Sequence, residues 1–453
     1  MAKYKAYPEY KESGVEWIDS IPSYWEVKPT FALCDASTQK NIDGAESNVL
    51  SLSYGNIIPR DVETNFGLLP ESFNTYQVIS CGDVILRLTD LQNDKNSLRV
   101  GLAKQKGIIT SAYLKLKANS DINPNFLYRL LHSYDTTKVF YGMGGGLRQS
   151  MKFEDFRRLP LLLPPYEEQI KISAFLDHET AKIDNLIEKQ QQLINLLKEK
   201  RQAVISHAVT KGLNPDVPMK DSGVELLGEV PAHWDSVRVK QVSSFITSGP
   251  RGWSDYITDD GDEIFLQSGD LNNELGLHLD KAKRVSPPKN AEGIRTRLMN
   301  GDVVICITGA NTGRVAIVSK LSQKTYINQH LSLIRPEIPK INASFLGYCL
   351  ASSNGHSYFE VAQYGLKEGL NLSNIAEAPL ALPPLHEQDA IVKYLKCVQN
   401  NYDYLSCLSA NQVGLLQERR TALISAAVTG KIDVRDWVAP DTQDVEEPQE
   451  ATA

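Results

Sequence analysis

Residues 11–27 read KESGVEWIDSIPSYWEV, and residues 220–237 read KDSGVELLGEVPAHWDSV. Both stretches contain Ser-Gly-Val-Glu and then Pro-x-x-Trp, which ends at Trp25 in the first and at Trp234 in the second. Matches at an offset of 219 residues continue downstream, at Gly82-Asp83-Val84 and Gly301-Asp302-Val303, Pro164-Pro165 and Pro383-Pro384, Glu168-Gln169 and Glu387-Gln388, and Ala208-Val209-Thr210 and Ala427-Val428-Thr429. Repetition at a long period indicates copies of one structural unit, so the chain is a tandem duplication.

Each copy is expected to have a mixed first part and a helical second part. The first part alternates turn residues with short β-type runs, such as Asp83–Leu88 and Asp302–Thr308. The second part follows a Pro-Pro pair, which suits a helix start, and keeps a helical pattern for about 45 residues. We therefore expect an α+β protein with two tandem mixed α/β domains, each followed by a long helix. The predicted boundaries are 1–164 for the first domain, 165–212 for the first helix, 213–383 for the second domain, 384–430 for the second helix and 431–453 for an acidic, disordered tail.

The two long helices share a heptad register. Seam positions recur every seven residues from Leu176 and from Leu395, and one polar position, Gln190 or Ser409, falls at the same level in both helices. Such a seam predicts an antiparallel coiled coil with pseudo-two-fold symmetry. The alternative is that each amphipathic helix packs only on its own domain. The residues expected to pair are Leu176, Ile183, Leu186, Leu193, Leu197, Val204, Leu395, Tyr402, Leu405, Leu416 and Leu423.

The composition is typical of a folded protein without a membrane span. Hydrophobic residues make up 42% of the 453 and charged residues 23%, and no run of 18 apolar residues occurs. The polar start, Met1 to Gly14, does not fit a secretory signal. The six cysteines form no C-x-x-C pair, so we expect reduced thiols in a cytoplasmic protein and no disulfide framework or zinc site.

The net charge of −7 does not exclude nucleic acid as a partner. Residues 433–453 hold seven acids and one arginine, so the rest of the chain is close to neutral and can carry local basic patches. Two basic clusters occur, at 87–106 and 281–297; such clusters suit phosphates, while Arg, Asn and Gln suit base edges. The candidate DNA-binding residues are Arg87, Asn93, Lys95, Arg99, Lys104, Arg148, Arg251, Trp253, Lys281, Lys283, Arg284, Lys289, Arg295, Arg297, Asn311, Arg314 and Gln329.

Motifs that indicate catalysis are mostly missing. Leu163-Pro164-Pro165-Tyr166 resembles the Asn/Asp-Pro-Pro-Tyr loop of adenine amino-methyltransferases, but the side chain of Leu163 cannot accept a hydrogen bond from an amino group. The glycine-rich stretches 141–146 and 309–313 lack the surrounding features of a nucleotide-binding loop. We therefore expect no catalytic residue, no metal ligand and no cofactor bound by this chain.

The duplicated pattern resembles the specificity subunit of type I restriction-modification enzymes over nearly the whole chain. The resemblance rests on the Ser-Gly-Val-Glu…Pro-x-x-Trp opening, the Gly-Asp-Val strand, the Leu-Pro-Pro-x-x-Glu-Gln helix start at 163–169 and 382–388, and the helix end at 200–210 and 419–429. It implies that each mixed domain is a target recognition domain for one half of a bipartite, asymmetric site in double-stranded DNA. It also implies that the long helices set the gap between the halves. The implied partners are two modification subunits and restriction subunits, which would bind the AdoMet, ATP and Mg.

Two other hypotheses stay open. The chain could itself be an enzyme, such as a degenerate methyltransferase or a nuclease, and AdoMet binding by the isolated chain would favour this. It could also be a coiled-coil scaffold that never touches DNA. In that case Arg295→Ala and Arg297→Ala would leave the DNA affinity of an assembled complex unchanged.

Overall fold

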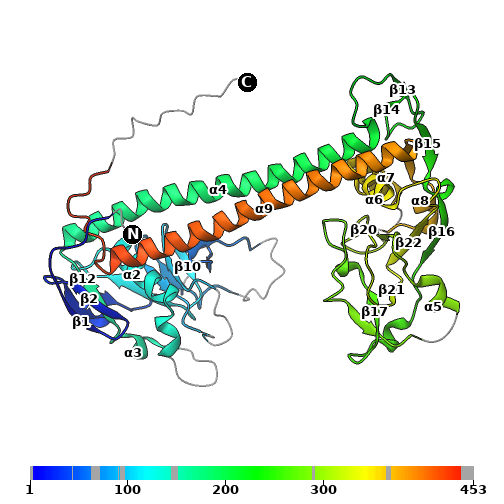
Figure 1. Ribbon diagram of the computed structural model, residues 1–453. Coiled ribbons are helices and arrows are strands. Elements are labelled where there is room, and N and C mark those ends of the chain that lie inside the picture. The colour runs from blue at the N-terminus through cyan, green and yellow to red at the C-terminus, as the bar shows by residue number, and fades with distance from the viewer. Residues whose placement is uncertain are drawn as a thin grey trace. The chain divides into compact units, whose positions relative to one another are not determined.

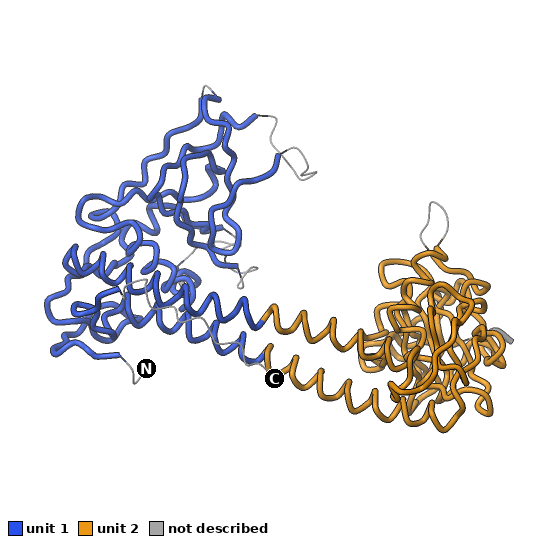
Figure 2. Tube along the Cα trace, turned by 90° about the horizontal axis from the view of Figure 1, so that it is seen from above, with its two compact units in different colours: residues 1–190, 411–453 blue, residues 191–410 orange. Residues whose placement is uncertain are grey.

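The computed structural model describes residues 4–42, 44–62, 72–89, 91, 97–143, 151–287, 291–363 and 369–439. The chain forms two compact units (Figure 2). Unit 1 consists of residues 1–190 with 411–453, and unit 2 of residues 191–410. Each unit therefore contains one mixed domain together with part of both long helices. No helix in the described ranges is long and apolar enough to cross a bilayer.

Unit 1 is built from small antiparallel sheets beside the two long helices (Figure 1). Its strands are β1 (Tyr10–Val15), β2 (Ile18–Pro22), β3 (Glu26–Pro29), β4 (Cys34–Asp35), β5 (Leu50–Ser53), β6 (Asn56–Pro59), β7 (Gln77–Ile79), β8 (Val84–Leu86), β9 (Val100–Leu102), β10 (Gly107–Ile109), β11 (Leu114–Ala118) and β12 (Pro160–Leu163). Its helices are α1 (Thr30–Leu33), α2 (Pro124–Thr136), η1 (Val139–Gly142), α3 (Phe153–Phe156), the first part of α4 (Tyr166–Lys211) and the last part of α9 (Leu385–Val428). The central sheet has the order β4-β11-β8-β9, and β1–β2, β3–β12, β5–β6 and β7–β10 form two-stranded pairs.

Unit 2 repeats this plan, with one three-stranded sheet besides its main sheet. Its strands are β13 (Met219–Asp221), β14 (Glu229–Pro231), β15 (Asp235–Arg238), β16 (Ser243–Ser248), β17 (Glu263–Leu266), β18 (Lys283–Val285), β19 (Val303–Cys306), β20 (Val315–Ile317), β21 (Thr325–Ile327), β22 (Leu331–Pro336) and β23 (Pro379–Leu382). Its further helices are η2 (Val239–Gln241), η3 (Trp253–Tyr256), η4 (Ser268–Asp270), α5 (Ala291–Thr296), α6 (Ala343–Ala351), α7 (Ser353–Ala362) and α8 (Leu372–Ala376). The main sheet has the order β16-β22-β19-β20, and a second sheet, β18-β17-β21, contains the parallel pair β17–β21.

A tryptophan–glutamate hydrogen bond joins each domain to the start of a long helix. Trp25 donates from Nε1 to Oε1 of Glu168 (3.1 Å), and Trp234 donates from Nε1 to Oε2 of Glu387 (3.0 Å). Both indoles are fully buried, where a polar N–H without a partner would be costly. The repeated Pro-x-x-Trp and Glu-Gln motifs are therefore two halves of one contact.

The glutamine that follows each glutamate secures a second helix. Gln169 Oε1 accepts from the backbone N–H of Asn123, and Gln388 Oε1 accepts from that of Asn342, both at 2.7 Å. Asn123 and Asn342 are the N-caps of α2 and α6, and their side chains accept from the first helical N–H groups. The start of α4 is thereby joined to α2 in unit 1, and the start of α9 to α6 in unit 2.

The end of each long helix packs on the same tryptophans. Gly212, after α4, has φ +76°, and a Cβ there would lie 3.2 Å from the Trp234 ring. Gly430, after α9, has φ +74°, and a Cβ there would meet Pro22 at 2.3 Å. A positive φ and this close approach both favour glycine. Each tryptophan is thus held by the start of one long helix and the end of the other.

The long helices run antiparallel within each unit (Figure 1). In unit 1 Arg420 Nε donates to Asp184 Oδ1 at 2.8 Å, and in unit 2 Arg201 Nη1 donates to Asp403 Oδ1 at 2.6 Å. The two pairs match at the repeat offset with the helices exchanged. The predicted pairing of the two helices is therefore confirmed, in place of separate packing on each domain. The pseudo-two-fold symmetry stays a prediction.

The covered positions of α4 alternate between spacings of four and three residues. The seven-residue series is buried at Leu176, Ile183, Leu395 and Leu423 and half-buried at Leu197, Val204, Tyr402 and Leu416. The prediction is wrong for Leu186, Leu193 and Leu405, which are 48%, 41% and 43% exposed. Ile187 and Ile194 are half-buried instead. They lie four residues after the seam positions Ile183 and Gln190, and the partner helix covers this side, whereas Leu186 and Leu193 lie three residues after them.

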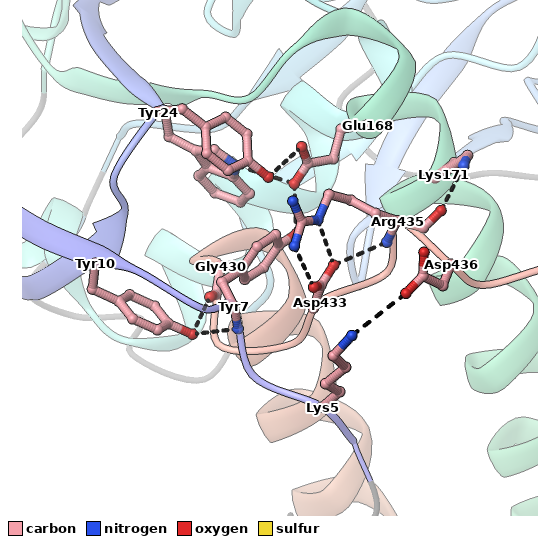
Figure 3. Close-up of polar contacts among 11 residues, drawn as sticks. Lys5, Tyr7, Tyr10, Tyr24, Glu168, Lys171, Gly430, Asp433, Arg435 and Asp436 are labelled. Atoms are coloured by element: carbon pink, nitrogen blue, oxygen red, sulfur yellow. Dashed lines mark hydrogen bonds and ion pairs between the residues drawn. The ribbon is translucent and has the colours of Figure 1, made fainter.

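The segment after α9 is packed against unit 1, so the prediction of disorder is wrong for residues 431–439. Ile432 and Val434 are buried. Arg435 pairs with Asp433 at 2.7 Å, and its guanidinium lies 5.1 Å from the ring centroid of Tyr7 (Figure 3). Two apolar side chains and this ion pair hold the segment in place. Residues 440–453 lie outside the described chain.

Glu168, in the upper part of Figure 3, is a hydrogen-bond acceptor for several side chains. It is 5% exposed and accepts from the hydroxyls of Tyr7 (2.5 Å) and Tyr24 (2.9 Å) as well as from Trp25. Burial and the hydrogen bond to Glu168 raise the pKa of Tyr24 to about 12. The Glu387 side chain is 32% exposed, and its partners besides Trp234 include His233 (2.7 Å).

We expect Glu168→Ala to destabilise unit 1 by about 3 kcal/mol, because it leaves the buried donors of Tyr7 and Trp25 without their acceptor. Glu387→Ala should cost unit 2 only about 1 kcal/mol, because water can replace a half-exposed carboxylate. Urea unfolding measures both, with Glu168→Gln as the control that keeps an acceptor oxygen. Equal losses for the two alanine variants would contradict the difference in burial.

Candidate nucleic-acid interface

Five of the predicted cations are exposed in the domain of unit 2, and one of them, Arg295, lies in α5. Arg251 follows β16, Lys281 precedes β18, Lys283 lies in β18 and Arg297 follows α5. Their positive charges are available to a polyanion such as a phosphate backbone.

Strand register places two of these cations in one row. Lys283 pairs with Phe265, Phe265 with Tyr326, and Tyr326 with Arg297. Residues directly opposite one another across neighbouring strands share a sheet face. Lys283 and Arg297 therefore flank the aromatic pair Phe265 and Tyr326 on one face of the β18-β17-β21 sheet.

Two of the predicted arginines are engaged with neighbouring side chains. Arg284 Nη1 donates to Gln323 Oε1 at 2.7 Å, and Arg295 Nη1 donates to Thr247 Oγ1. Arg295 is nevertheless exposed and Arg284 half-buried, so both keep surface for a ligand.

Trp253, Asn311 and Arg314 have structural roles that the sequence did not indicate. Trp253 is 2% exposed and packs with Phe265 and Tyr326, so its ring cannot serve as an open stacking platform. Asn311 donates to the carbonyl of Ser268 (3.1 Å), and Arg314 to that of Leu271 (3.1 Å). Both half-buried side chains line a cavity of about 280 Å³ that also includes Arg201 and Gln202 of α4.

Arg99 of unit 1 is a core residue rather than a base reader. It is fully buried, and its guanidinium donates to Tyr141 Oη (3.0 Å) and to the carbonyls of Arg87 (3.2 Å) and Thr89 (2.8 Å). A planar guanidinium held by three acceptors cannot also reach into a DNA groove. The prediction that Arg99 contacts DNA is therefore wrong.

The other first-domain candidates are placed only in part. Arg87 is half-buried, and exposed Lys104 lines a cavity of about 570 Å³ together with Arg129, Asp184 and Arg420. Asn93, Lys95 and Arg148 of unit 1, and Lys289 of unit 2, lie outside the described residues.

Exposed Gln329 lines a polar hollow in unit 2, which we call the recess. The sequence alone did not group the residues that line it. The recess has a volume of about 280 Å³ and is lined by Pro250, Gly252, Trp253, Ser254, Phe265, Gln267, Ser268, Asn328, Gln329 and His330. Gln267 and Asn328 directly follow β17 and β21, so they lie at the carboxyl ends of a parallel pair. The sequence did not indicate this grouping, because β17 and β21 each have the pattern of an ordinary strand and their parallel pairing leaves no local pattern.

Nearby backbone packs closely around the recess. A Cβ at Gly249 would lie 2.2 Å from the carbonyl oxygen of Asn328, so only glycine fits between β16 and Pro250. Within the described ranges, no group of three or more His, Cys, Asp or Glu side chains could hold a metal ion.

Comparison with known proteins agrees with this architecture. The family described as "Type I restriction modification DNA specificity domain" matches residues 231–406. A putative type I restriction enzyme MjaX specificity subunit from Methanocaldococcus jannaschii is 26% identical over 71% of each chain. The type I restriction enzyme EcoBI specificity subunit from Escherichia coli is 24% identical over 74% of this chain and 71% of its own.

A solved structure shows the same fold over nearly the full length. It is described as the structural basis underlying complex assembly and conformational transition of the type I R-M system. Its chain aligns with a TM-score of 0.68 and 19% identity, over 91% of this chain and 99% of its own.

The two arginine environments predict opposite effects on stability. Arg99→Ala should destabilise unit 1 by about 3 kcal/mol, because it removes a buried guanidinium and leaves acceptors without donors. The control, Arg297→Ala, should change stability by less than about 0.5 kcal/mol because Arg297 is exposed. Urea unfolding of the two variants decides this; a stable Arg99→Ala protein would return Arg99 to the surface candidates.

Proposed function

We propose that this chain, which belongs to the specificity subunits of type I restriction-modification systems, recognises a bipartite, asymmetric DNA target with one half-site for each unit. The chain is a non-catalytic DNA-recognition subunit, and it directs the modification and restriction subunits of the complex to that target. The observation that carries this proposal is the repeated Trp–Glu–Gln framework, which consists of Trp25, Glu168 and Gln169 in unit 1 and Trp234, Glu387 and Gln388 in unit 2.

Different recognition parts on the same framework support two different half-sites. Both units contain a parallel strand contact, the bridge Val49–Ile108 in unit 1 and the pair β17–β21 in unit 2. The cations Lys283 and Arg297 lie at the two sides of the β18-β17-β21 sheet in unit 2. Sequence is read by side chains that reach base edges, while phosphate contacts fix position. Two domains with unlike loops therefore suit an asymmetric target. Arg251, Lys281, Lys283 and Arg297 would contact phosphates.

The long helices are the proposed contact surface for the modification subunits. In unit 2 Leu193, Leu196, Leu405 and Leu408 are each more than 40% exposed. An apolar hollow of about 320 Å³ lies between the helices beside Leu196 and Leu405. Exposed leucines on paired helices are typical of a surface that a partner helix covers.

The repeated framework also supports one modification subunit for each unit, hence two in the complex. AdoMet would then be bound by these subunits, and ATP and Mg by the restriction subunits. The long helices would set the separation of the half-sites. The rise of DNA per base pair is regular, so a fixed length of helix corresponds to a fixed number of base pairs.

Single-molecule mapping of adenine methylation tests the proposed function. DNA from cells that express this chain with its modification partner is compared with DNA from cells that express the partner alone. The expected result is a two-part motif, with a methylated adenine in each half, that appears only when the chain is present. No motif with an active, bound partner would leave the chain as a scaffold and contradict the proposal.

A further inference from the structure

We propose that Gln329 recognises the adenine of one A·T pair in the half-site of unit 2, and that His330 and Thr308 hold its amide in position. The inference rests on the proposed function and deepens it, because it assigns one base pair to one side chain. Gln329 lies in the short connection between the parallel strand β21 and the central strand β22.

A chain of side-chain contacts fixes the orientation of the Gln329 amide. Its Nε2 lies 3.2 Å from Nε2 of His330, and Nδ1 of the same ring lies 2.5 Å from Oγ1 of Thr308. The backbone of His330 is anchored as well: its N–H donates to Asn328 Oδ1 (3.1 Å), and its carbonyl accepts from the Ile307 N–H (2.9 Å). An exposed glutamine would otherwise lose side-chain entropy on binding.

The contacts also fix which atoms of the amide remain for a ligand. When His330 Nε2 accepts from one N–H of Gln329, the ring proton is on Nδ1 and is donated to Thr308 Oγ1. The amide then keeps one N–H donor and its carbonyl acceptor. This pair matches N7 and the N6 amino group of adenine in the major groove, the edge that Asn and Gln bind in a bidentate way.

The surroundings of Gln329 suit a base edge rather than a small apolar ligand. Gln267, Ser268 and Asn328 give the recess polar walls, and Trp253 with Phe265 closes its apolar side. Arg251 is adjacent to the lining residues Pro250 and Gly252, and Lys283 pairs with the lining residue Phe265. Cations around a polar hollow fit phosphates on either side of the base that is read.

The corresponding connection in unit 1 lacks this side chain. Residues 110–113, between β10 and β11, read Thr-Ser-Ala-Tyr. A buried glutamine, Gln77, contacts this connection and donates from its amide to the carbonyls of Thr110 (3.1 Å) and Tyr113 (2.7 Å). A change at Gln329 should therefore affect one half-site only.

The test is Gln329→Ala in the full chain, expressed with its modification partner and mapped for adenine methylation. We expect one A·T position in one half-site to lose its preference by about tenfold or more, the range that a bidentate contact supports. The other half-site and the gap should not change. Thr308→Val, which removes the hydroxyl that positions His330, should relax the same position by a smaller factor.

Gln39→Ala is the matched control, because Gln39 is an exposed glutamine of unit 1; it should leave the motif intact. Melting and copurification with the partner show that each variant is folded. An unchanged motif in Gln329→Ala overturns the inference, and so does relaxation at a G·C pair or loss of all methylation by a folded, assembled variant. Absence of any two-part motif for the unmodified chain would instead contradict the proposed function.

Discussion

The hydrogen bond between a buried tryptophan and a glutamate at the start of a long helix is the contact on which both units depend. Trp25–Glu168 and Trp234–Glu387 join segments that are 143 and 153 residues apart in the chain. A buried indole N–H without an acceptor is costly. The hydrogen bond to glutamate therefore holds the start of the long helix beside the domain. The following glutamine then ties α2 or α6 to the same helix. The position of each recognition sheet relative to its helix start thus follows from three residues.

The two copies of this contact are equal in geometry but unequal in surroundings. Glu168 also accepts from Tyr7 and Tyr24, and the segment that follows α9 returns Arg435 to the same site. Glu387 is partly open to water and meets His233 instead of a tyrosine. Unit 1 therefore uses the two ends of the described chain to enclose its carboxylate, whereas the corresponding site of unit 2 lies in the interior of the sequence.

The sequence predicted the duplication, the long helices and their pairing because these depend on spacing that repeats along the chain. It misplaced Leu186, Leu193 and Leu405 because residues three and four positions on lie on adjacent sides of a helix, and only the partner decides which side is covered. The predicted disordered tail begins too close to the helix, because the acidic composition of the segment hid two apolar residues, Ile432 and Val434. Their burial depends on parts of unit 1 that are distant in sequence.

The candidate site was less predictable for a physical reason. A basic residue looks the same in sequence whether it is exposed, as Arg297 is, or buried against carbonyls, as Arg99 is. The recess depends on the parallel pairing of β17 with β21, which are separated by about 60 residues of chain. No local pattern reports such a pairing, so Gln267 and Asn328 could not be grouped with Gln329 in advance.

The claim that each unit reads its own half-site is tested most directly by exchanging one recognition part. Residues 239–378, between β15 and β23, are replaced by the corresponding part of a relative, which keeps Trp234, Glu387 and Gln388 in place. Methylation mapping of the chimera should show one half-site replaced, with the other half-site and the gap unchanged. A folded, assembled chimera that changed both half-sites, or neither, would contradict the account.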